Sequence, residues 1–216
     1  MGIVTDNSDK SRSPGRKARG FGHERRAEIL TAAERVFVTH GYAGATIRRI
    51  AEDVGVSPTA LYMHFPDKHS MLMELGAGAL DRMIDGASAI FDGPGDARDK
   101  VKAVLTAHIR FGLKNKTAYQ LVFTEGARDI VKDTGATREK AGQYYRILPT
   151  LIGQLAKQGR VPKGSVHGVS QTLWCGVHGL VTYLINMPGF GWVEVDELVG
   201  LMVNGLVDGL IAEKAP

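Results

Sequence analysis

The side chains whose type and spacing suit nucleic-acid binding lie between Thr46 and Lys68. After Ser57, a predicted helix presents an outward face of short or planar side chains with no carboxylate to repel phosphate: Thr59, Ala60, Tyr62 and His64. Thr46 and Lys68 each stand near the start of a predicted helix, where free backbone N–H groups and the helix dipole favour an anion. Arg48 and Arg49 lie outward on the helix after Thr46, either as DNA contacts or as a solvated face. Together these residues predict a surface that contacts DNA.

A second group of side chains suits a small apolar ligand. Trp174 and His178 are four residues apart and share one face of a predicted helix. With them we expect further rings to line a pocket that has few polar groups: His108, Phe111, Tyr119, Phe123 and Tyr144 or Tyr145. The alternative is ordinary core packing, because aromatic residues at helical spacing usually belong to the core.

Metal and enzyme chemistry are both disfavoured. His108, His167 and His178 form no His-x-x-x-His pair and have no carboxylate at ligand spacing. Cys175 is the only cysteine, which excludes a disulfide framework, and within an apolar helix it is expected to be inert. The sequence has no glycine-rich phosphate loop, nucleophile elbow or HExxH motif. We therefore expect no enzymatic activity, no metal and no cofactor.

The elements that must position the first group are short helices. A helix is predicted from His23, because apolar side chains recur at three- and four-residue steps up to Gly41, which supplies the left-handed residue that ends a helix. Thr46 is expected to cap a second helix that closes at Gly55. Ser57 caps a third, with Pro58 at its first position and two side chains pointing inward, Leu61 and Phe65. Asp67 caps a fourth, which begins at Lys68.

Two short helices joined by a glycine-containing turn make a helix-turn-helix. In that geometry the second helix enters a major groove about 12 Å wide, while the first crosses the backbone and sets the angle. The sequence around Thr46–Lys68 therefore predicts a DNA-reading unit rather than an isolated pair of helices.

The run TIRRIAEDVGVSPTALYMHFPDKHSML closely resembles the DNA-binding domain of the TetR (tetracycline-repressor-like) transcriptional regulators, and the preceding ERRAEILTAAERVFVTHGYAGAT fits it too. The resemblance covers about residues 24–75. It implies that Thr46 and Arg48 touch phosphate and base, that the recognition helix opens with Ser57, Thr59 and Ala60, and that Tyr62 and His64 make further contacts. It also implies that Lys68 grips backbone phosphate.

The rest of the chain is predicted to be helical as well. We expect helices over 68–91, 96–114, 117–126, 137–157, 166–186 and 195–213, and no sustained period-two alternation marks a strand. The fold class is therefore all-α. Trp174–Leu180 (WCGVHGL) is similar to the Trp-His-Gly (WHG) pattern in the C-terminal domain of one TetR subgroup, and His108–Phe123 resembles that subgroup's first sensor helices.

The last helix carries two adjacent apolar stripes. One contains Leu198, Leu201, Met202 and Leu206, and the other contains Val199, Val203 and Val207. A helix needs only one stripe to pack on its own domain. The helix over 166–186 adds small residues that permit close approach. We expect a homodimer formed through the last two helices, unless both are plain core helices.

The amino-acid composition agrees with the predictions above. The 216 residues are 44% hydrophobic and 23% charged, with a formal net charge of +4, as in an ordinary globular chain. Residues 1–22 are polar and basic, and are expected to form an unfolded arm. The stretch between Lys163 and Glu194 has no Lys, Arg, Asp or Glu, but its polar residues favour a buried helix over a membrane span. No apolar leader follows Met1, so we expect a cytoplasmic protein without membrane contact.

These observations predict three segments: a basic arm over 1–22, a helix-turn-helix domain over 23–70, and an effector-binding and dimerisation domain over 71–216. The function implied is a ligand-responsive regulator, most simply a repressor released from a near-palindromic double-stranded operator by a small hydrophobic effector. The fourth helix would serve as the lever between the domains. The alternatives are a helical small-molecule-binding protein, an enzyme or an interaction module, each without DNA binding.

Overall fold

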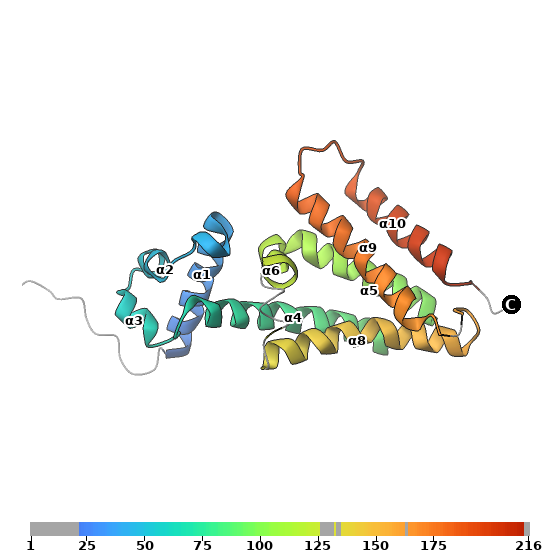
Figure 1. The fold of residues 1–216 in the computed structure, drawn as a ribbon, viewed down its shortest axis with the longest axis horizontal. Helices are drawn as coiled ribbons and strands as arrows, with labels where there is room; N and C mark the ends of the chain where they lie inside the picture. Colours follow the sequence, from blue (N-terminus) through green and yellow to red (C-terminus); the bar gives the residue numbers. More distant parts are fainter. Residues whose placement is uncertain (1–21, 126–131, 133–134, 163, 214–216) are drawn as a thin grey trace, which may run out of the picture.

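The computed structural model describes residues 22–125, 132, 135–162 and 164–213. Helices account for the regular structure of these ranges, and no strand occurs in them, so the all-α prediction is confirmed (Figure 1). The elements are α1 Gly22–Gly44, α2 Ile47–Val54, α3 Pro58–Tyr62, α4 Lys68–Asp92, α5 Ala97–Lys114, α6 Lys116–Gln120, the π-helical η1 Leu121–Glu125, α8 Ala136–Lys157, α9 Val166–Asn186 and α10 Val195–Leu210. The predicted basic arm lies outside the described residues, apart from Gly22.

The first three helices pack on the start of α4 around a small hydrophobic core. Its fully buried members include Ile29, Ala33, Ile50, Leu61 and Phe65. Local caps set the turns between the helices. The Thr46 hydroxyl accepts a hydrogen bond from the Arg49 N–H at 3.2 Å, and the Ser57 hydroxyl accepts one from the Ala60 N–H at 3.1 Å. Gly55, with φ +76°, ends α2 in the left-handed region. The predicted helix-turn-helix is therefore present.

The start of α4 is fixed by a capping box. The Asp67 carboxylate accepts the Ser70 N–H at 2.7 Å, while the Ser70 hydroxyl lies 3.4 Å from the Asp67 N–H. The hydrogen bond from the Ser70 N–H to the carboxylate, with a smaller contribution from the Ser70 side chain, lowers the pKa of Asp67. The fourth helix begins at Lys68, as predicted.

One boundary in this unit differs from the prediction. Gly41 does leave the helical region, with φ +66°, but one further turn of helix continues to Gly44. The Ala45 N–H bonds back to the Gly41 carbonyl at 3.1 Å, and the Arg49 guanidinium donates to the Gly44 carbonyl at 2.6 Å. These two bonds satisfy backbone groups of the extra turn.

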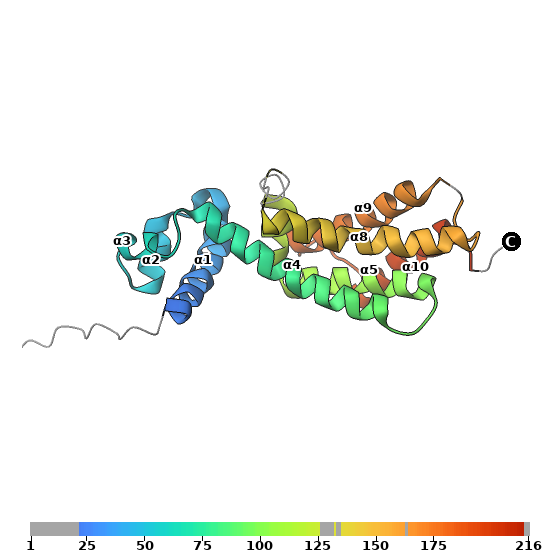
Figure 2. The same ribbon diagram turned by 90° about the horizontal axis from the view of Figure 1, so that it is seen from below.

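A second and larger core is built from α4, α5, α8, α9 and α10. The long helix α4 joins the two cores: Met71 and Leu72 are buried in the first, and Ala79 and Leu80 in the second (Figure 2). η1 also connects the two cores, because its first residue, Leu121, is buried in the first core. The predicted DNA-binding unit is therefore joined to the rest of the chain at two places, α4 and η1.

Two predicted helices differ in detail. The expected helix over 117–126 divides into α6 and η1, and Gly126 lies outside the described residues. The last helix ends at Leu210 rather than Glu213, because Ile211 turns to extended backbone and is buried. The Ala212 N–H then bonds to the Arg160 carbonyl at 2.9 Å, which a continued helix would not allow.

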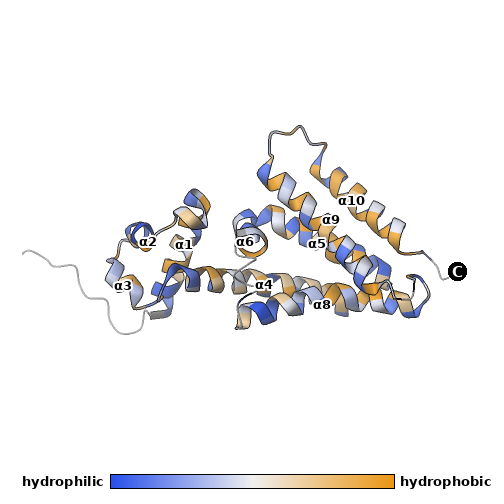
Figure 3. Ribbon diagram, in the orientation of Figure 1, coloured by the Kyte–Doolittle hydropathy of each residue, from blue (hydrophilic) through white to orange (hydrophobic). Residues whose placement is uncertain are grey.

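Hydrophobic residues prevail along α9 and α10 (Figure 3). The valine stripe of α10 is buried against its own domain, whereas Leu201 on the leucine stripe is 63% exposed. The two helices meet closely at Gly176, where an added Cβ would lie 2.5 Å from the Leu206 side chain. Within the described ranges, no helix is long and apolar enough to cross a membrane.

Candidate nucleic-acid interface and ligand site

The residues predicted to contact DNA lie on α2, on α3 and its flanking turns, and at the first residue of α4. They occupy the end of the molecule far from α10 (Figure 2). Tyr62 is 53% exposed, whereas a residue that supports the core would be covered. Thr46, Arg48, Ser57 and Thr59 are exposed, while Ala60, His64 and Lys68 are half-buried. All eight predicted positions therefore lie on α2, α3, their flanking turns or the first residue of α4, and each is exposed or half-buried.

Arg48 is a highly exposed cation on α2. Its guanidinium pairs with Glu52 one turn later at 2.9 Å, and 83% of its side chain is exposed. An exposed pair of this kind contributes little to stability. The guanidinium can therefore exchange Glu52 for a phosphate at small cost.

Met63, next to Tyr62, is also exposed. The sequence analysis did not predict it as a contact, although it lies between the inward positions Leu61 and Phe65.

Lys68 has a structural contact that the sequence did not predict. Its ammonium group donates to the carbonyls of Tyr42 at 2.7 Å and Ala45 at 3.1 Å, and lies 4.4 Å from the centre of the Tyr42 ring. Lys68 thus joins the start of α4 to the turn before α2. An ammonium has three N–H donors, so one remains for a phosphate.

Arg26 is a positioning residue that sequence reasoning also missed. Its guanidinium pairs with Glu74 on α4, donates to the His64 carbonyl, and stacks 4.0 Å from the centre of the Phe65 ring. These contacts hold the turn that follows α3 against α1 and α4. Arg26 and His64 are 38 residues apart, so no local pattern reveals the contact.

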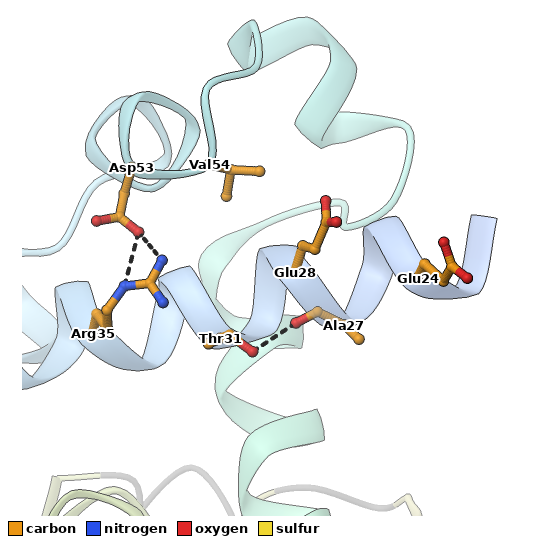
Figure 4. Close-up of a pocket in the computed structure, with 7 residues that line it drawn as sticks. All are labelled: Glu24, Ala27, Glu28, Thr31, Arg35, Asp53 and Val54. Carbon is orange, nitrogen blue, oxygen red and sulfur yellow. Dashed lines mark hydrogen bonds and ion pairs between the residues drawn. The ribbon is translucent and has the colours of Figure 1, made fainter. Parts of the chain in front are cut away.

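A shallow hollow of about 570 Å³ lies between α1 and α2 (Figure 4). Its lining includes Glu24, Glu28 and Asp53, and its one arginine, Arg35, is paired with Asp53 at 2.5 Å. Because carboxylates outnumber the arginine, this hollow would repel a phosphate backbone. It does not belong to the predicted DNA surface.

The C-terminal core brings most of the predicted ligand-site rings together. A chain of hydrogen bonds runs through four of them: Tyr144 to His108 Nδ1 at 2.9 Å, His108 Nε2 to Tyr119 at 3.3 Å, and Tyr119 to His178 Nδ1. Trp174 and Phe123 pack on the same rings, with ring centres 4.5 Å and 4.6 Å from that of His178. We call these six residues the aromatic cluster.

Burial keeps the aromatic cluster neutral. Desolvation lowers the pKa of His108 well below its ordinary value, with a smaller contribution from His178, and it lowers the pKa of His178 to about 4. Desolvation likewise raises the pKa of Tyr119 and of Tyr144. The buried His178 Nε2 has no hydrogen-bond partner among the described residues. The chain of hydrogen bonds thus ends in one unsatisfied group, which carries a free-energy cost.

The predicted pocket is only partly open. A cavity of about 130 Å³ is lined by three of the predicted residues, His108, Phe111 and Tyr144. A void of about 10 Å³, room for about one water, touches His108, Tyr144 and Trp174. Tyr119, Phe123 and His178 line neither space. Of the two tyrosines that sequence left open, Tyr144 is buried in the cluster, while Tyr145 packs edge-on against Trp174 at 5.3 Å.

Metal-binding potential is weak. In the part of the chain that the structure describes, no three His, Cys, Asp or Glu side chains come together to hold an ion. Cys175 lies on the exposed side of α9. Nothing in these contacts suggests acid–base or nucleophilic chemistry.

Comparison with family models matches both units of the chain. Residues 29–75 match the model described as bacterial regulatory proteins, tetR family, and residues 101–206 match tetracyclin repressor-like, C-terminal domain. The second match concerns the domain as a whole, so the likeness of Trp174–Leu180 to the Trp-His-Gly subgroup stays a prediction.

Two curated relatives match part of the chain. The chain is 32% identical over 100 residues to the HTH-type transcriptional activator FasR of Mycolicibacterium smegmatis, covering 46% of each chain. It is 46% identical over 61 residues to the repressor AcnR of Corynebacterium diphtheriae, covering 28% of this chain and 32% of AcnR. The chain therefore spans about half and about a third of the lengths of these relatives.

Solved structures share the whole fold. The ketosteroid transcriptional regulator KstR2 of Mycobacterium tuberculosis superposes with a TM-score of 0.71 over 88% of this chain and 96% of its own, at 20% sequence identity. The likeness extends through both helical units.

Proposed function

The chain belongs to the tetR family of bacterial regulatory proteins, and from that premise we propose that it is a homodimeric repressor that leaves a near-palindromic DNA site when a small hydrophobic effector binds. Membership of this family makes the chain a DNA-binding transcriptional regulator rather than an enzyme. FasR is an activator and AcnR a repressor, so repression belongs to the proposal alone. Acting on chromosomal DNA, such a regulator would work in the cytoplasm.

The observation that carries the DNA-binding role is the exposed surface of α2 and α3. In the proposed complex, the residues of α3 and its flanking turns face the major groove, and Arg48 reaches the backbone from α2. Lys68 would use its remaining donor on a phosphate. The Ser57 and Thr46 hydroxyls accept cap bonds with their oxygens and keep their O–H groups to donate.

We place the dimer interface on α9 and α10. Exposed apolar side chains continue from Tyr183 on α9 through Phe190 in the connecting loop to Leu201 on α10. Large apolar patches on a protein surface commonly mark an interface. A two-fold axis through this patch would present two recognition helices to successive major grooves.

The effector is proposed to act between the aromatic cluster and the DNA-binding unit. KstR2 is named for ketosteroids, which supports a hydrophobic effector. Two links carry the coupling: α4, which is part of both cores, and Leu121, which lies two residues after Tyr119 and is buried in the first core. The two cores also support division of the chain near residue 70. An effector that reverses a 1:99 population must favour one state by about 5.5 kcal/mol.

Selection of duplexes from a random pool by mobility shift tests the function. The full chain should enrich an inverted repeat. Arg48→Ala should weaken binding and reduce the slope of log K against log salt by about 1, whereas Arg146→Ala, an exposed arginine on α8, should change neither. A chain that enriches no duplex at low salt would instead be a helical ligand-binding protein, and the proposal would fail.

A further inference from the structure

The cavity of about 130 Å³ between α4, α5 and α8 has a distinct chemical character. Its apolar lining comes from Met83 and Ala87 on α4 and from Ala107 and Phe111 on α5. Among the described residues that line it, Arg82 alone carries a permanent charge. His108 and Tyr144 supply further wall, and the hydrogen bond between them occupies His108 Nδ1.

Arg82 lies at the rim of this cavity. It is exposed, and its guanidinium carbon lies 5.9 Å from the centre of the Phe111 ring, which is itself part of the wall. No ion pair to Arg82 is found among the described residues. Lys140, in contrast, is paired with Asp81. A planar cation beside an apolar opening suits a carboxylate, because it can donate two parallel hydrogen bonds to it.

We propose that this cavity binds a small carboxylic acid with a hydrocarbon body of about six carbon atoms, whose carboxylate pairs with Arg82. The size follows from the volume, since an apolar cavity of about 150 Å³ holds benzene. The hydrocarbon body lies against Met83, Ala87 and Phe111, and the His108 ring in the cavity wall is neutral because desolvation lowers its pKa. The inference rests on the proposed function, because the acid would be the effector.

The site is placed to act on DNA binding. Met83 and Ala87 belong to α4, whose first turn packs in the DNA-binding unit. His108 and Tyr144 belong to the aromatic cluster, in which His108 is hydrogen-bonded to Tyr119 on α6, the helix directly before η1. An occupant therefore touches α4 directly and reaches the second link, at Leu121, only through His108 and Tyr119.

Isothermal titration calorimetry of the full chain with benzoate, and with benzamide as its neutral isostere, tests the inference. Benzoate should bind, and benzamide should bind at least about tenfold more weakly, as expected for loss of a charge-assisted hydrogen bond. Arg82→Gln should weaken benzoate at least about tenfold and leave benzamide unchanged, whereas the control Arg146→Gln should alter neither ligand. Ala107→Leu, which fills the cavity, should abolish binding of both, while Ala103→Leu, exposed and one turn earlier on α5, should not.

Three results would overturn the inference: no benzoate binding at millimolar concentration, equal binding of benzamide, or unchanged binding by Arg82→Gln. The surface position of Arg82 keeps this last test valid even if Ala107→Leu fails to fold. A mobility shift on the same samples separates the two proposals. Retained DNA binding without benzoate binding defeats the ligand inference alone, and benzoate binding without DNA binding defeats the proposed function alone.

Discussion

Acid should destabilise this protein through its buried histidines well above the pH at which carboxylates are protonated. His178 has its pKa lowered from 6.5 to about 4, and that of His108 is also lowered. Between pH 6.5 and about 4, the histidines of the unfolded chain take up protons that those of the folded chain do not. The free energy of unfolding is therefore highest above pH 6.5 and falls as the pH falls towards 4.

The size of the effect follows from the same shifts. Each buried histidine contributes about 1.4 kcal/mol per pH unit within the window. At pH 5, His178 alone has lowered the free energy of unfolding by about 2 kcal/mol, and the lowered pKa of His108 acts in the same direction. The His178 effect is a substantial part of a typical stability of about 5–15 kcal/mol.

Urea unfolding at pH 7.5, 6 and 5, at one fixed protein concentration, measures this dependence. His178→Phe should reduce the slope of unfolding free energy against pH, because one of the two histidines with a lowered pKa is gone. His167→Phe, exposed on the same helix, should leave the slope as it is. A wild-type slope near zero between pH 6.5 and 5, or an unchanged slope in His178→Phe, would refute the reasoning.

Three further predictions concern Leu121, which links the two cores, Arg26, which positions the turn after α3, and Leu201 in the proposed dimer interface. Leu121→Ala should cost about 3 kcal/mol in urea unfolding and weaken DNA binding by mobility shift; unchanged affinity would mean that the two cores are uncoupled. Arg26→Gln should raise the dissociation constant for DNA several-fold with unchanged helicity by circular dichroism, because the turn after α3 loses its contact with α1 and α4, and affinity equal to wild type would contradict this. Leu201→Glu should yield monomers in analytical ultracentrifugation, since it puts a charge in the proposed interface; a persistent dimer would place that interface elsewhere.

Local patterns were sufficient for much of the fold. Thr46, Gly55, Ser57 and Asp67 were predicted as helix ends, and each is one, because capping hydrogen bonds join groups within about four residues. α9 has both ends where the pattern placed them. The errors occur where distant contacts override the local preference: α10 ends early because Ile211 and Ala212 pack and bond elsewhere in the domain.

At the candidate sites, too, local sequence predicted some features, and others depended on contacts between distant residues. Sequence grouped the rings of the aromatic cluster by type and helix face, but Phe111 lies apart from that cluster, beside Arg82 at the cavity. The choice between Tyr144 and Tyr145 could not be made from sequence, because adjacent positions on a helix differ only in which neighbour they meet. Lys68 was expected to face phosphate alone, and its bonds to the Tyr42 and Ala45 carbonyls span more than 20 residues of chain.

The amino-acid sequence by itself determined the helices, their caps and the residues that face outward on α2 and α3, since these depend on side-chain periodicity and on bonds within one turn. Only the tertiary structure decided which side chains meet across helices: Arg26 with the turn after α3, Leu121 with the first core, and Arg82 with the cavity. Such contacts depend on how helices pack, and packing is settled by the whole core rather than by any one segment.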